Sequence, residues 1–299
     1  MSAVADLEAR GLLRRDVPLG PLTTYRSGGP ARWFAEVADP AALAEIVSSG
    51  VTINQPVLVL GRGSNLVVSD AGFDGVVIQL SGSFTRIEVA SELVIAGGAA
   101  PLPRVARAAV DEGLRGLEFF VGIPGSVGGA VRQNAGCFGV ETKDVLRSAE
   151  LIDLSSGETR RAGPHDLDLT YRHSNVRPSE VVVEASFRVS PGDQEEAREE
   201  MRRITRWRRE NQPGGTLNAG SVFKNPPGAA AGEIIDRLGL KGLRVGDVRV
   251  SEKHANFFVA GPRATSADIR RLVNEVKSRV FEATGTMLET EIQFVGFEE

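Results

Sequence analysis

The segment from residue 116 to residue 139 constrains the fold more than any other part of the chain. It reads GLEFFVGIPGSVGGAVRQNAGCFG and is dense in glycine and apolar residues, with few strong helix or strand formers. Because glycine has no Cβ, a backbone of this kind can approach a ligand closely. The segment therefore predicts a glycine-rich wall, with little regular structure of its own, against a flat or charged ligand.

Regular structure is expected on both sides of this segment. Period-two apolar runs and turn residues predict strands, and apolar residues at helical spacing predict helices. The expected strands are 57–60, two within 66–80 that are interrupted at 70–75, a hairpin within 84–97, and strands within 148–161, 180–190, 255–260 and 287–296. The expected helices are 101–114, 194–209, 229–240 and 265–284, the last with Thr265 or Ser266 as N-cap and Gly285 at its end. After residue 213 the pattern resembles βαβαβ.

Composition excludes several classes of protein. The 299 residues carry 35 Lys and Arg against 39 Asp and Glu, so the net charge of −4 lacks the basic excess of a nucleic-acid-binding protein. Cys137 is the only cysteine, which excludes a disulfide framework, and we expect no metal site. No signal peptide or long apolar run is present, so we expect a cytoplasmic protein without a membrane partner. The basic run at 202–210 follows an acidic one and is either a solvated helix or an anion-binding patch.

The motif GRGSN, at residues 61–65, follows a predicted strand. Gly61 and Gly63 fit the dinucleotide fingerprint, but its third glycine is replaced by Leu66, and a strand pattern follows where a helix is needed. A Rossmann domain is therefore excluded. Two interpretations stay open, because the same residues suit a backbone nest for an anion and a plain hairpin turn.

Two serines lie in small-residue motifs. PGSVGG, at 124–129, resembles a nucleophile elbow, but Pro124 replaces the first glycine and the chain has only three histidines. Ser221 lies in NAGSVFKNP, where no histidine occurs within seven residues on either side and Lys224 follows three residues later. Ser221 and Lys224 suit an anion contact or a shared proton, and the motif alone does not decide between these roles and a nucleophile.

Two further motifs carry charged residues at short spacing. In YRHSN, Arg172 lies between Tyr171 and His173, so its guanidinium fork either grips a carboxylate or belongs to a surface turn. In LETEIQFVG, Glu289 and Glu291 are two residues apart and would share one face of a strand, which faces either solvent or a polar cavity.

Taken in order, these segments resemble the UDP-N-acetylenolpyruvoylglucosamine reductase family, whose members are also called UDP-N-acetylmuramate dehydrogenases. The blocks that carry the resemblance run from about residue 20 to 296, and together they are far more specific than any one alone. They are TTYRSGGPA, LGRGSNLVVSDAGFDGVVI, GLEFFVGIPGSVGGAVRQNAGCFG, YRHSN, NAGSVFKNP, AGEIIDRLGLKGLRVGDVRVSEKHANFFV and ATSADI.

The resemblance implies an α+β fold. It consists of an FAD-binding module of the vanillyl-alcohol-oxidase (PCMH) type in two subdomains and a C-terminal α/β substrate domain. The expected boundaries are an N-terminal segment at 1–20, the FAD-binding domain at 21–195 with subdomains of about 21–82 and 83–195, and the substrate-binding domain at 196–299. The form GGAVRQNAG and the compact length resemble the shorter type of the family, which lacks a substrate-capping insertion.

The resemblance also implies the reaction. NADPH reduces FAD, and the reduced flavin then delivers hydride from N5 to the enolpyruvyl methylene of UDP-N-acetylglucosamine enolpyruvate, which gives UDP-N-acetylmuramate. This step belongs to peptidoglycan precursor synthesis, and hence to cell-wall biogenesis, cell shape, the cell cycle and cell division. We expect a monomer whose partners are these small molecules. The alternatives are another FAD oxidoreductase of the same fold with a different acceptor, or an inactive sugar-nucleotide-binding relative.

Three catalytic residues follow from the family's motifs. Arg172 matches the arginine of Y-R, Ser221 the serine of A-G-S-x-F-K-x-P, and Glu291 the second glutamate of L-E-x-E-[VI]. The resemblance implies that Arg172 and Glu291 hold and polarise the substrate carboxylate as charge develops there. Ser221 would then donate a proton to the α-carbon as a general acid.

The remaining site residues are implied in the same way. The residues expected to contact FAD are Tyr25, Arg26, Gly61, Arg62, Gly63, Ser64, Asn65, Leu66, Gly98, Ala99, Gly122, Ile123, Pro124, Gly125, Ser126, Gly128, Gly129, Asn134 and Gly136. Those expected to contact substrate are Tyr171, Arg209, Lys224, Asn225 and His254. The chain departs from the family at Asn211, where a lysine is common and where Arg208 or Arg209 is the candidate substitute. Cys137 and Phe138 are milder changes in QNAGCFG.

Overall fold

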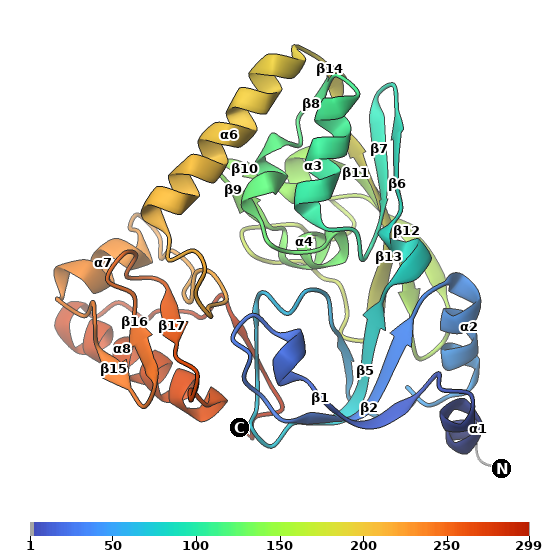
Figure 1. The fold of residues 1–299 in the computed structure, drawn as a ribbon, viewed down its shortest axis with the longest axis horizontal. Coiled ribbons are helices and arrows are strands. Elements are labelled where there is room, and N and C mark those ends of the chain that lie inside the picture. Colours follow the sequence, from blue (N-terminus) through green and yellow to red (C-terminus); the bar gives the residue numbers. More distant parts are fainter. Residues whose placement is uncertain (1–2, 299) are drawn as a thin grey trace. The chain divides into compact units, whose positions relative to one another are not determined.

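A computed structural model describes residues 3–298, and it divides into two compact units (Figure 1). Among these residues, unit 1 comprises 3–16, 33–61 and 75–207, and unit 2 comprises 17–32, 62–74 and 208–298. Two early segments thus belong with the C-terminal part of the chain, which no pattern in the sequence indicates. The expected boundary at 195/196 concerns cofactor and substrate binding, and it stays a prediction.

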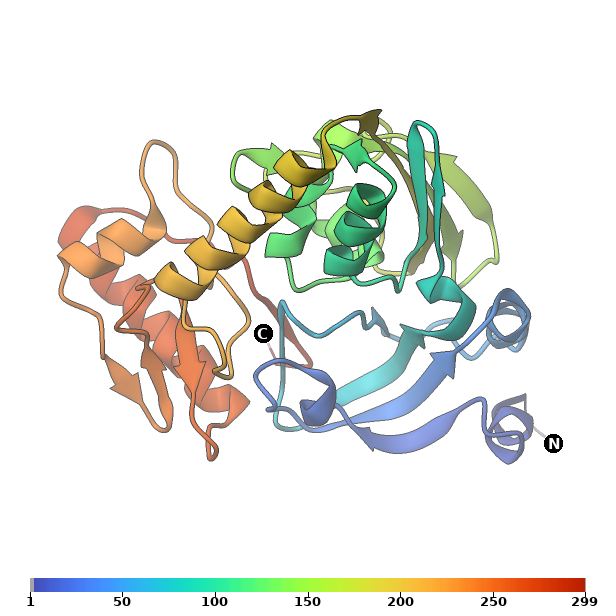
Figure 2. The same ribbon diagram turned by 45° about the horizontal axis from the view of Figure 1, so that its top comes forward.

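The larger part of unit 1 is an antiparallel sheet of five strands, covered on one face by two helices (Figures 1 and 2). The strand order is β12-β11-β13-β7-β6, and Ala185 of β13 lies opposite Ala96 of β7 and Ala149 of β11. The strands are β6 (Ile87–Ala90), β7 (Leu93–Gly97), β11 (Leu146–Asp153), β12 (Thr159–Ala162) and β13 (Glu180–Arg188). The helices are α3 (Leu102–Asp111) and α4 (Val127–Gln133).

The sequence explains how α3 packs. Pro101 precedes the helix and Pro103 lies in its first turn, where a missing N–H costs no hydrogen bond. Leu102, Val105 and Ala109 recur at helical spacing and are fully buried against the sheet. The expected helix at 101–114 and the expected hairpin of β6 and β7 are both confirmed.

The glycine-rich segment contains more regular structure than its composition indicates. A 3-10 turn, η3 (Glu118–Gly122), precedes α4, and α4 ends at Asn134, whose φ of 41° is the left-handed conformation that closes many helices. Two short strands, β9 (Gly136–Cys137) and β10 (Val140–Glu141), then form a hairpin ahead of α5 (Thr142–Val145). The expectation of little regular structure here was wrong, because apolar residues such as Val127 and Val131 are buried against the sheet.

A second sheet has the order β1-β2-β5-β3, and the division between the units passes through three of its strands. The elements of this region are α1 (Ala3–Ala9), β1 (Arg14–Pro18), β2 (Pro30–Val37), α2 (Pro40–Ser48), β3 (Val57–Val59) and β5 (Phe73–Leu80). Strand β3 pairs in parallel with β5, and Asp39 caps α2 by accepting a hydrogen bond from the N–H of Ala42. Further short elements are η1 (Gly20–Leu22), η2 (Gly82–Thr85), and the paired β8 (Leu114–Arg115) and β14 (Ser190–Pro191).

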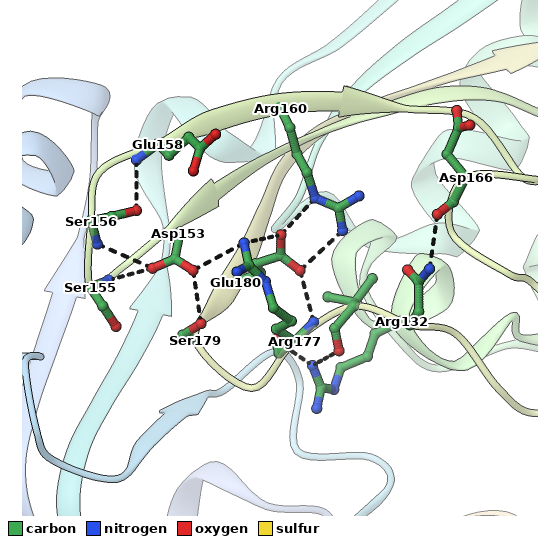
Figure 3. A network of polar contacts seen from close by, with 12 residues as sticks. Arg132, Asp153, Ser155, Ser156, Glu158, Arg160, Asp166, Arg177, Ser179 and Glu180 are labelled. Carbon is green, nitrogen blue, oxygen red and sulfur yellow. Dashed lines mark hydrogen bonds and ion pairs between the residues drawn. The ribbon is translucent and has the colours of Figure 1, made fainter.

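A buried carboxylate network holds one end of the five-stranded sheet (Figure 3). Glu180, at the start of β13, accepts two hydrogen bonds from Arg160 of β12, at 2.6 and 3.1 Å. Arg177 donates to Glu180 from its side chain at 3.1 Å and from its backbone at 2.8 Å. Arg177 also reaches Asp153, whose carboxylate accepts from Ser179 at 3.0 Å. We call these five residues the Glu180 cluster.

Unit 2 is built around an antiparallel sheet with the order β15-β16-β17. Its elements are the end of α6 (Gln194–Asn211), α7 (Ala231–Arg237), β15 (Arg244–Val245), β16 (Val248–Val250), β17 (Phe258–Ala260), α8 (Ser266–Thr284) and β18 (Gln293–Val295). The βαβαβ expectation was wrong, because three consecutive short strands form an antiparallel sheet before α8 begins. Helix α8 has the expected Thr265 cap and ends at Gly285, whose φ is 70°.

Strand β18 pairs in parallel with β4 (Leu66–Val68), so that Gln293 lies opposite Leu66. This strand is shorter than expected, because it begins only at Gln293. Glu289 and Glu291 therefore precede the strand, and the expectation that they share a strand face was wrong. An isolated bridge between Thr290 and Phe223 holds this stretch instead.

Candidate functional site

Two turns of unit 1 form a surface made of backbone. Their hydrogen bonds join the N–H of Gly128 to the carbonyl of Gly98 at 2.8 Å, and the N–H of Val127 to the carbonyl of Ala100 at 3.0 Å. The first turn follows β7 and the second begins α4. Glycine is required at Gly98, because a Cβ there would lie 1.9 Å from the carbonyl oxygen of Val182. The turn after β7 is thus clamped between α4 and the sheet.

The same surface has little side-chain cover near Ser126. A Cβ on Gly61 would lie 2.8 Å from Oγ of Ser126, so any side chain there would fill the space beside that hydroxyl. Gly129 is exposed, and the nearest atom to a Cβ there is again Oγ of Ser126, at 3.6 Å. Exposed backbone flanked by small residues accommodates the flat ring or the diphosphate of a dinucleotide. These residues of unit 1 therefore fit FAD.

The remaining wall residues differ in their exposure. Pro124 is exposed, whereas Gly122 and Ser126 are buried, and the rest are half-buried. The half-buried ones are Ala99, Ile123, Gly125, Gly128 and Gly136. A cofactor at this wall would therefore meet backbone and small side chains, as the sequence predicts.

Asn134 has a structural role. Its side chain is completely buried, donates to Oε2 of Glu141 at 3.0 Å and to the carbonyl of Thr170 at 2.8 Å, and accepts from the N–H of Lys143 at 2.9 Å. These hydrogen bonds occupy the side-chain amide, and a cofactor contact of Asn134 stays a prediction. Asn134 ties the end of α4 to the turn that carries Arg172.

Arg172 lies in a tight turn of unit 1. Thr170 and His173 exchange two backbone hydrogen bonds, at 3.2 and 3.1 Å, and Arg172 between them has a φ of 54°, which is uncommon for a residue with a side chain. Its guanidinium lies over the ring of Tyr171, 4.9 Å from the centroid. Nη2 donates to the carbonyl of Gly136 at 3.1 Å, and Nη1 lies 3.6 Å from Oε1 of Glu141. The arginine is thus held in one orientation.

Ser221 and Glu291 are neighbours through the backbone in unit 2. Val222, which is fully buried, donates its N–H to the carbonyl of Asn256 and accepts from the N–H of Glu291, both at 2.8 Å. Ser221 forms an isolated bridge with Phe257. The two predicted catalytic residues of this unit are therefore held on adjacent stretches of chain, although 70 positions separate their numbers.

The side chain of Asn256 stabilises this arrangement. It is buried, accepts from the N–H of Phe223 at 3.0 Å through its side chain, and donates to the carbonyl of Phe223 at 2.8 Å. An asparagine that pairs with both backbone groups of one residue acts like an added strand. No motif in the sequence indicates this role of Asn256.

The GRGSN motif is divided between the units, since Gly61 belongs to unit 1 and Arg62–Asn65 to unit 2. The hairpin interpretation is wrong, because β3 pairs with β5 while β4 pairs with β18. Gly63 needs its φ of 60°, and a Cβ there would lie 2.3 Å from the carbonyl oxygen of Leu22. The anion-nest interpretation stays a prediction.

Asn65 links this motif to Glu291. Its Nδ2 donates to the carbonyl of Glu291 at 3.0 Å, and its own carbonyl accepts from the N–H of Gln293 at 2.9 Å. Ser64 and Leu66 beside it are half-buried. The segment predicted for the cofactor and the segment predicted for the substrate carboxylate are therefore hydrogen-bonded to each other in unit 2.

Tyr25 and Arg26 lie in unit 2 as well. Tyr25 is buried in the apolar core with Val67 and Ala219, and burial raises the pKa of its phenol. Among residues 3–298 its hydroxyl has no hydrogen-bond partner of normal geometry, although it faces the backbone of Ala219. Arg26 is exposed, with a φ of 55°. Their cofactor contacts stay predictions.

The expected substrate residues occupy different environments. Nζ of Lys224 lies 3.4 Å from Oε2 of Glu289. The side chain of Asn225 accepts from the N–H of Ala231 at 3.0 Å at the start of α7. Tyr171 and Arg209 are exposed, and the carbonyl of Arg209 accepts from Nζ of Lys253.

His254 is the most enclosed of the predicted substrate residues. Its Nδ1 accepts from the N–H of Asn256 at 3.3 Å, and its ring lies 4.8 Å from that of Phe257, centroid to centroid. Burial, with a smaller effect of the Lys241 charge, lowers the pKa of His254 below its ordinary value. The imidazole is therefore neutral at pH 7 and acts as a hydrogen-bonding group.

Comparisons with known proteins agree with this geometry. Residues 31–163 match the model of an FAD binding domain, and residues 212–295 match that of the UDP-N-acetylenolpyruvoylglucosamine reductase C-terminal domain. The UDP-N-acetylenolpyruvoylglucosamine reductase of Azorhizobium caulinodans is 43% identical over 98% of this chain and 95% of its own length. That of Sphingopyxis alaskensis is 44% identical over 99% of both chains. The chain belongs to the UDP-N-acetylenolpyruvoylglucosamine reductase family.

A solved structure extends the comparison to the fold. The crystal structure of UDP-N-acetylenolpyruvylglucosamine reductase from Thermus caldophilus superposes with a TM-score of 0.83 at 36% identity, and the match covers 95% of this chain and 99% of that one. The expected α+β architecture, an FAD-binding module followed by a family-specific C-terminal domain, is confirmed. The two matched regions leave helix α6 between them.

Within residues 3–298, no three His, Cys, Asp or Glu side chains form a group that could hold a metal ion. Over the same residues, every helix is too short or too polar to span a bilayer.

Proposed function

We propose that this protein is an NADPH-dependent, FAD-containing reductase that converts UDP-N-acetylglucosamine enolpyruvate to UDP-N-acetylmuramate in peptidoglycan precursor synthesis. One observation carries the proposal: Arg172, Ser221 and Glu291 all stand at the family's motif positions, and each is held by backbone hydrogen bonds. Relatives named for this activity match nearly the whole chain. Preorganised polar groups of this kind are the usual source of electrostatic catalysis.

The backbone wall around Ser126 would hold FAD in unit 1. The turn at Arg62–Leu66, which belongs to unit 2, stays a predicted FAD contact. When bound, FAD would accept hydride from NADPH and pass it to the enolpyruvyl methylene of the substrate. Gly61 and Gly129 keep side chains away from the space beside Ser126, so the cofactor would meet backbone there. Ser126 would add one hydroxyl to those contacts.

Arg172 would bind the substrate carboxylate. Hydride addition at the β-carbon pushes negative charge onto the α-carbon and the carboxylate, so a fixed cation nearby stabilises the transition state. The fork of a guanidinium matches a carboxylate better than an ammonium does. The turn at Thr170–His173 and the carbonyl of Gly136 hold the fork in place before substrate arrives. Glu291 would polarise the same carboxylate.

Ser221 would donate the proton that the α-carbon needs. A hydroxyl in this role requires a fixed position on one face of the carbon, which sets the stereochemistry, and it needs no histidine beside it. The bridge to Phe257 and the hydrogen bonds of Val222 supply that fixed position. The proton would come from Oγ, and solvent would reprotonate this oxygen after product leaves.

The UDP-sugar would lie against Tyr171, Arg209, Lys224, Asn225 and His254. Lys224 and Arg209 carry the positive charge that a diphosphate requires. His254, neutral at pH 7, would contribute a hydrogen bond without charge. The lysine common in the family at Asn211 is missing, and we propose that Arg208 or Arg209, one turn earlier on α6, replaces it. We also propose that the protein acts in the cytoplasm as a monomer, with consequences for cell shape and division.

An anaerobic flavin assay tests this proposal. The purified holoprotein should show flavin absorbance that NADPH bleaches, and UDP-N-acetylglucosamine enolpyruvate should restore it with formation of UDP-N-acetylmuramate. Bleaching followed by re-oxidation with an unrelated enoate, but not with this substrate, would assign the protein to a different acceptor. A colourless protein that binds UDP-sugars would show an inactive relative.

A further inference from the structure

We propose that Glu141 is a positioning residue that aims the Arg172 guanidinium at the substrate carboxylate, an inference that rests on the proposed function. No motif in the sequence indicates this role of Glu141. Its residue type is unremarkable in FGVETKD, where the spacing to Asp144 indicates only a helix cap.

Two polar contacts of the Arg172 guanidinium come from one hairpin. Nη2 donates to the carbonyl of Gly136 at 3.1 Å, and Nη1 lies 3.6 Å from Oε1 of Glu141. Gly136 of β9 and Glu141 of β10 are directly opposite each other in the hairpin register. The guanidinium is therefore held by both strands at a single rung, so the orientation of its plane depends on that rung.

Glu141 is itself held rigidly. Its Oε2 accepts from Nδ2 of Asn134 at 3.0 Å and lies 2.8 Å from Nζ of Lys143, while its backbone N–H donates to the Asp144 carboxylate at 2.8 Å. Asn134 also donates to the carbonyl of Thr170, which begins the Arg172 turn. The Glu141 carboxylate and the backbone of the Arg172 turn are thus hydrogen-bonded to the same buried amide, that of Asn134.

The charges explain why a carboxylate is needed at this position. The side chain of Arg172 is only 17% exposed, and a largely buried cation requires an anion or carbonyl oxygens around it. At 3.6 Å the Glu141 oxygen attracts Nη1 without making a short hydrogen bond. Such a partner orients the guanidinium and still permits it to bind a second carboxylate from substrate.

The test is Glu141→Gln in the purified holoenzyme, followed in each half-reaction by stopped-flow absorbance. Re-oxidation by UDP-N-acetylglucosamine enolpyruvate should slow by roughly 10–100-fold, as expected for a misplaced reacting group, while bleaching by NADPH stays within about twofold. Equal slowing of both halves, or no slowing of re-oxidation, would overturn the proposal.

Two matched variants separate positioning from general effects. Glu118→Gln removes a buried carboxylate of unit 1 that pairs with an arginine, Arg115, at 3.1 Å, and it should leave both half-reactions unchanged. Lys143→Met removes the other cation at Glu141 and should also leave them unchanged. If Lys143→Met reproduces the full effect of Glu141→Gln, the glutamate does not act through Arg172.

A double-mutant cycle supplies the decisive measurement. In an Arg172→Ala background, Glu141→Gln should slow re-oxidation by less than about twofold further, because its effect passes through the missing guanidinium. Full additivity would overturn the proposal. If Glu141→Gln loses flavin or melts early, Glu141→Asp is measured in its place, and loss of flavin from both assigns the residue to folding. Failure of the wild-type protein to turn over this substrate would instead reject the proposed function.

Discussion

Two arginine–carboxylate clusters of unit 1 use the same chemical groups with different geometry. In the Glu180 cluster, Arg160 grips the carboxylate with two nitrogens, at 2.6 and 3.1 Å, and the glutamate side chain is 1% exposed. At Arg172, the carboxylate of Glu141 stands 3.6 Å away, and a backbone carbonyl makes the shorter contact. The Arg160–Glu180 pair is therefore bidentate, whereas the Arg172–Glu141 pair makes no short hydrogen bond.

The backbone differs in the same sense. Arg160 lies in strand β12, where the extended conformation is comfortable, and Glu180 begins the neighbouring β13. Arg172 has a positive φ in a turn held by two hydrogen bonds. Strain of this kind is retained where a fixed side-chain direction is useful. The comparison teaches that a bidentate buried pair stabilises a fold, while a guanidinium held by one carbonyl and a more distant carboxylate can still bind a second carboxylate.

Ser221, which lies in neither cluster, should produce the largest effect on activity. Ser221→Ala should slow re-oxidation by the enolpyruvyl substrate by about 10²–10⁴-fold, because the α-carbon loses its proton donor. Bleaching by NADPH should be nearly unaffected, which stopped-flow traces of the two half-reactions will measure. Equal slowing of both would remove Ser221 from the role of acid.

Glu180→Gln breaks the Glu180 cluster. We expect it to lower the free energy of unfolding by about 3–5 kcal/mol, since Arg160 and Arg177 lose the charge that compensates them. Urea denaturation followed by circular dichroism measures this loss. The folded fraction should keep wild-type half-reactions. A stability change below about 1 kcal/mol would show that this cluster is no tighter than a surface ion pair.

Arg172→Ala should give the opposite profile. The oxidative half-reaction should slow by about 10²–10³-fold, as for loss of one preorganised donor, with little change in the urea midpoint. Arg172→Lys should recover only part of the rate, because an ammonium lacks the fork. A large loss of stability together with unchanged re-oxidation would invert the comparison between the two clusters.

The pH dependence of the unfolding free energy also tests the comparison, and we expect the smallest effect here. Burial alone would raise the pKa of Glu180, but hydrogen bonds from Arg160 and Arg177 lower it to about 2. A depressed pKa adds stability above the unfolded value of 4.5, and that stability disappears as the pH falls from 4.5 toward 2. The difference in unfolding free energy between wild type and Glu180→Gln, measured by urea titration, should shrink over this range. A constant difference would contradict the assignment.

Much of the fold and of the site could be predicted from the sequence. Helices α3, α6 and α8 were predicted close to their observed bounds because apolar spacing and caps such as Thr265 depend on neighbours in the chain. The exclusion of a Rossmann domain followed from Leu66 in the same way. Motif positions predict Arg172, Ser221 and Glu291 as catalytic residues, and these roles stay predictions, whereas the family that the motifs indicate is confirmed.

Other features depended on contacts that no local pattern carries. The amide of Asn65 meets the carbonyl of Glu291, 226 positions away, and β4 pairs with β18 across a similar distance. The same pairing makes GRGSN a connection between different sheets. Asn134 is predicted at the cofactor, and only its burial between Glu141 and Thr170 shows that it is also a support.

The sequence by itself determined which residue types are present for the chemistry, where the amphipathic helices run, and that the glycine-rich segment exposes backbone. Those properties follow from each residue's own side chain and its near neighbours. Only the tertiary structure decided that Glu180 forms a short ion pair with an arginine, at 2.6 Å, and that Glu141 lies 3.6 Å from one. The physical reason is that burial and hydrogen-bond geometry depend on groups that folding brings together from distant parts of the chain.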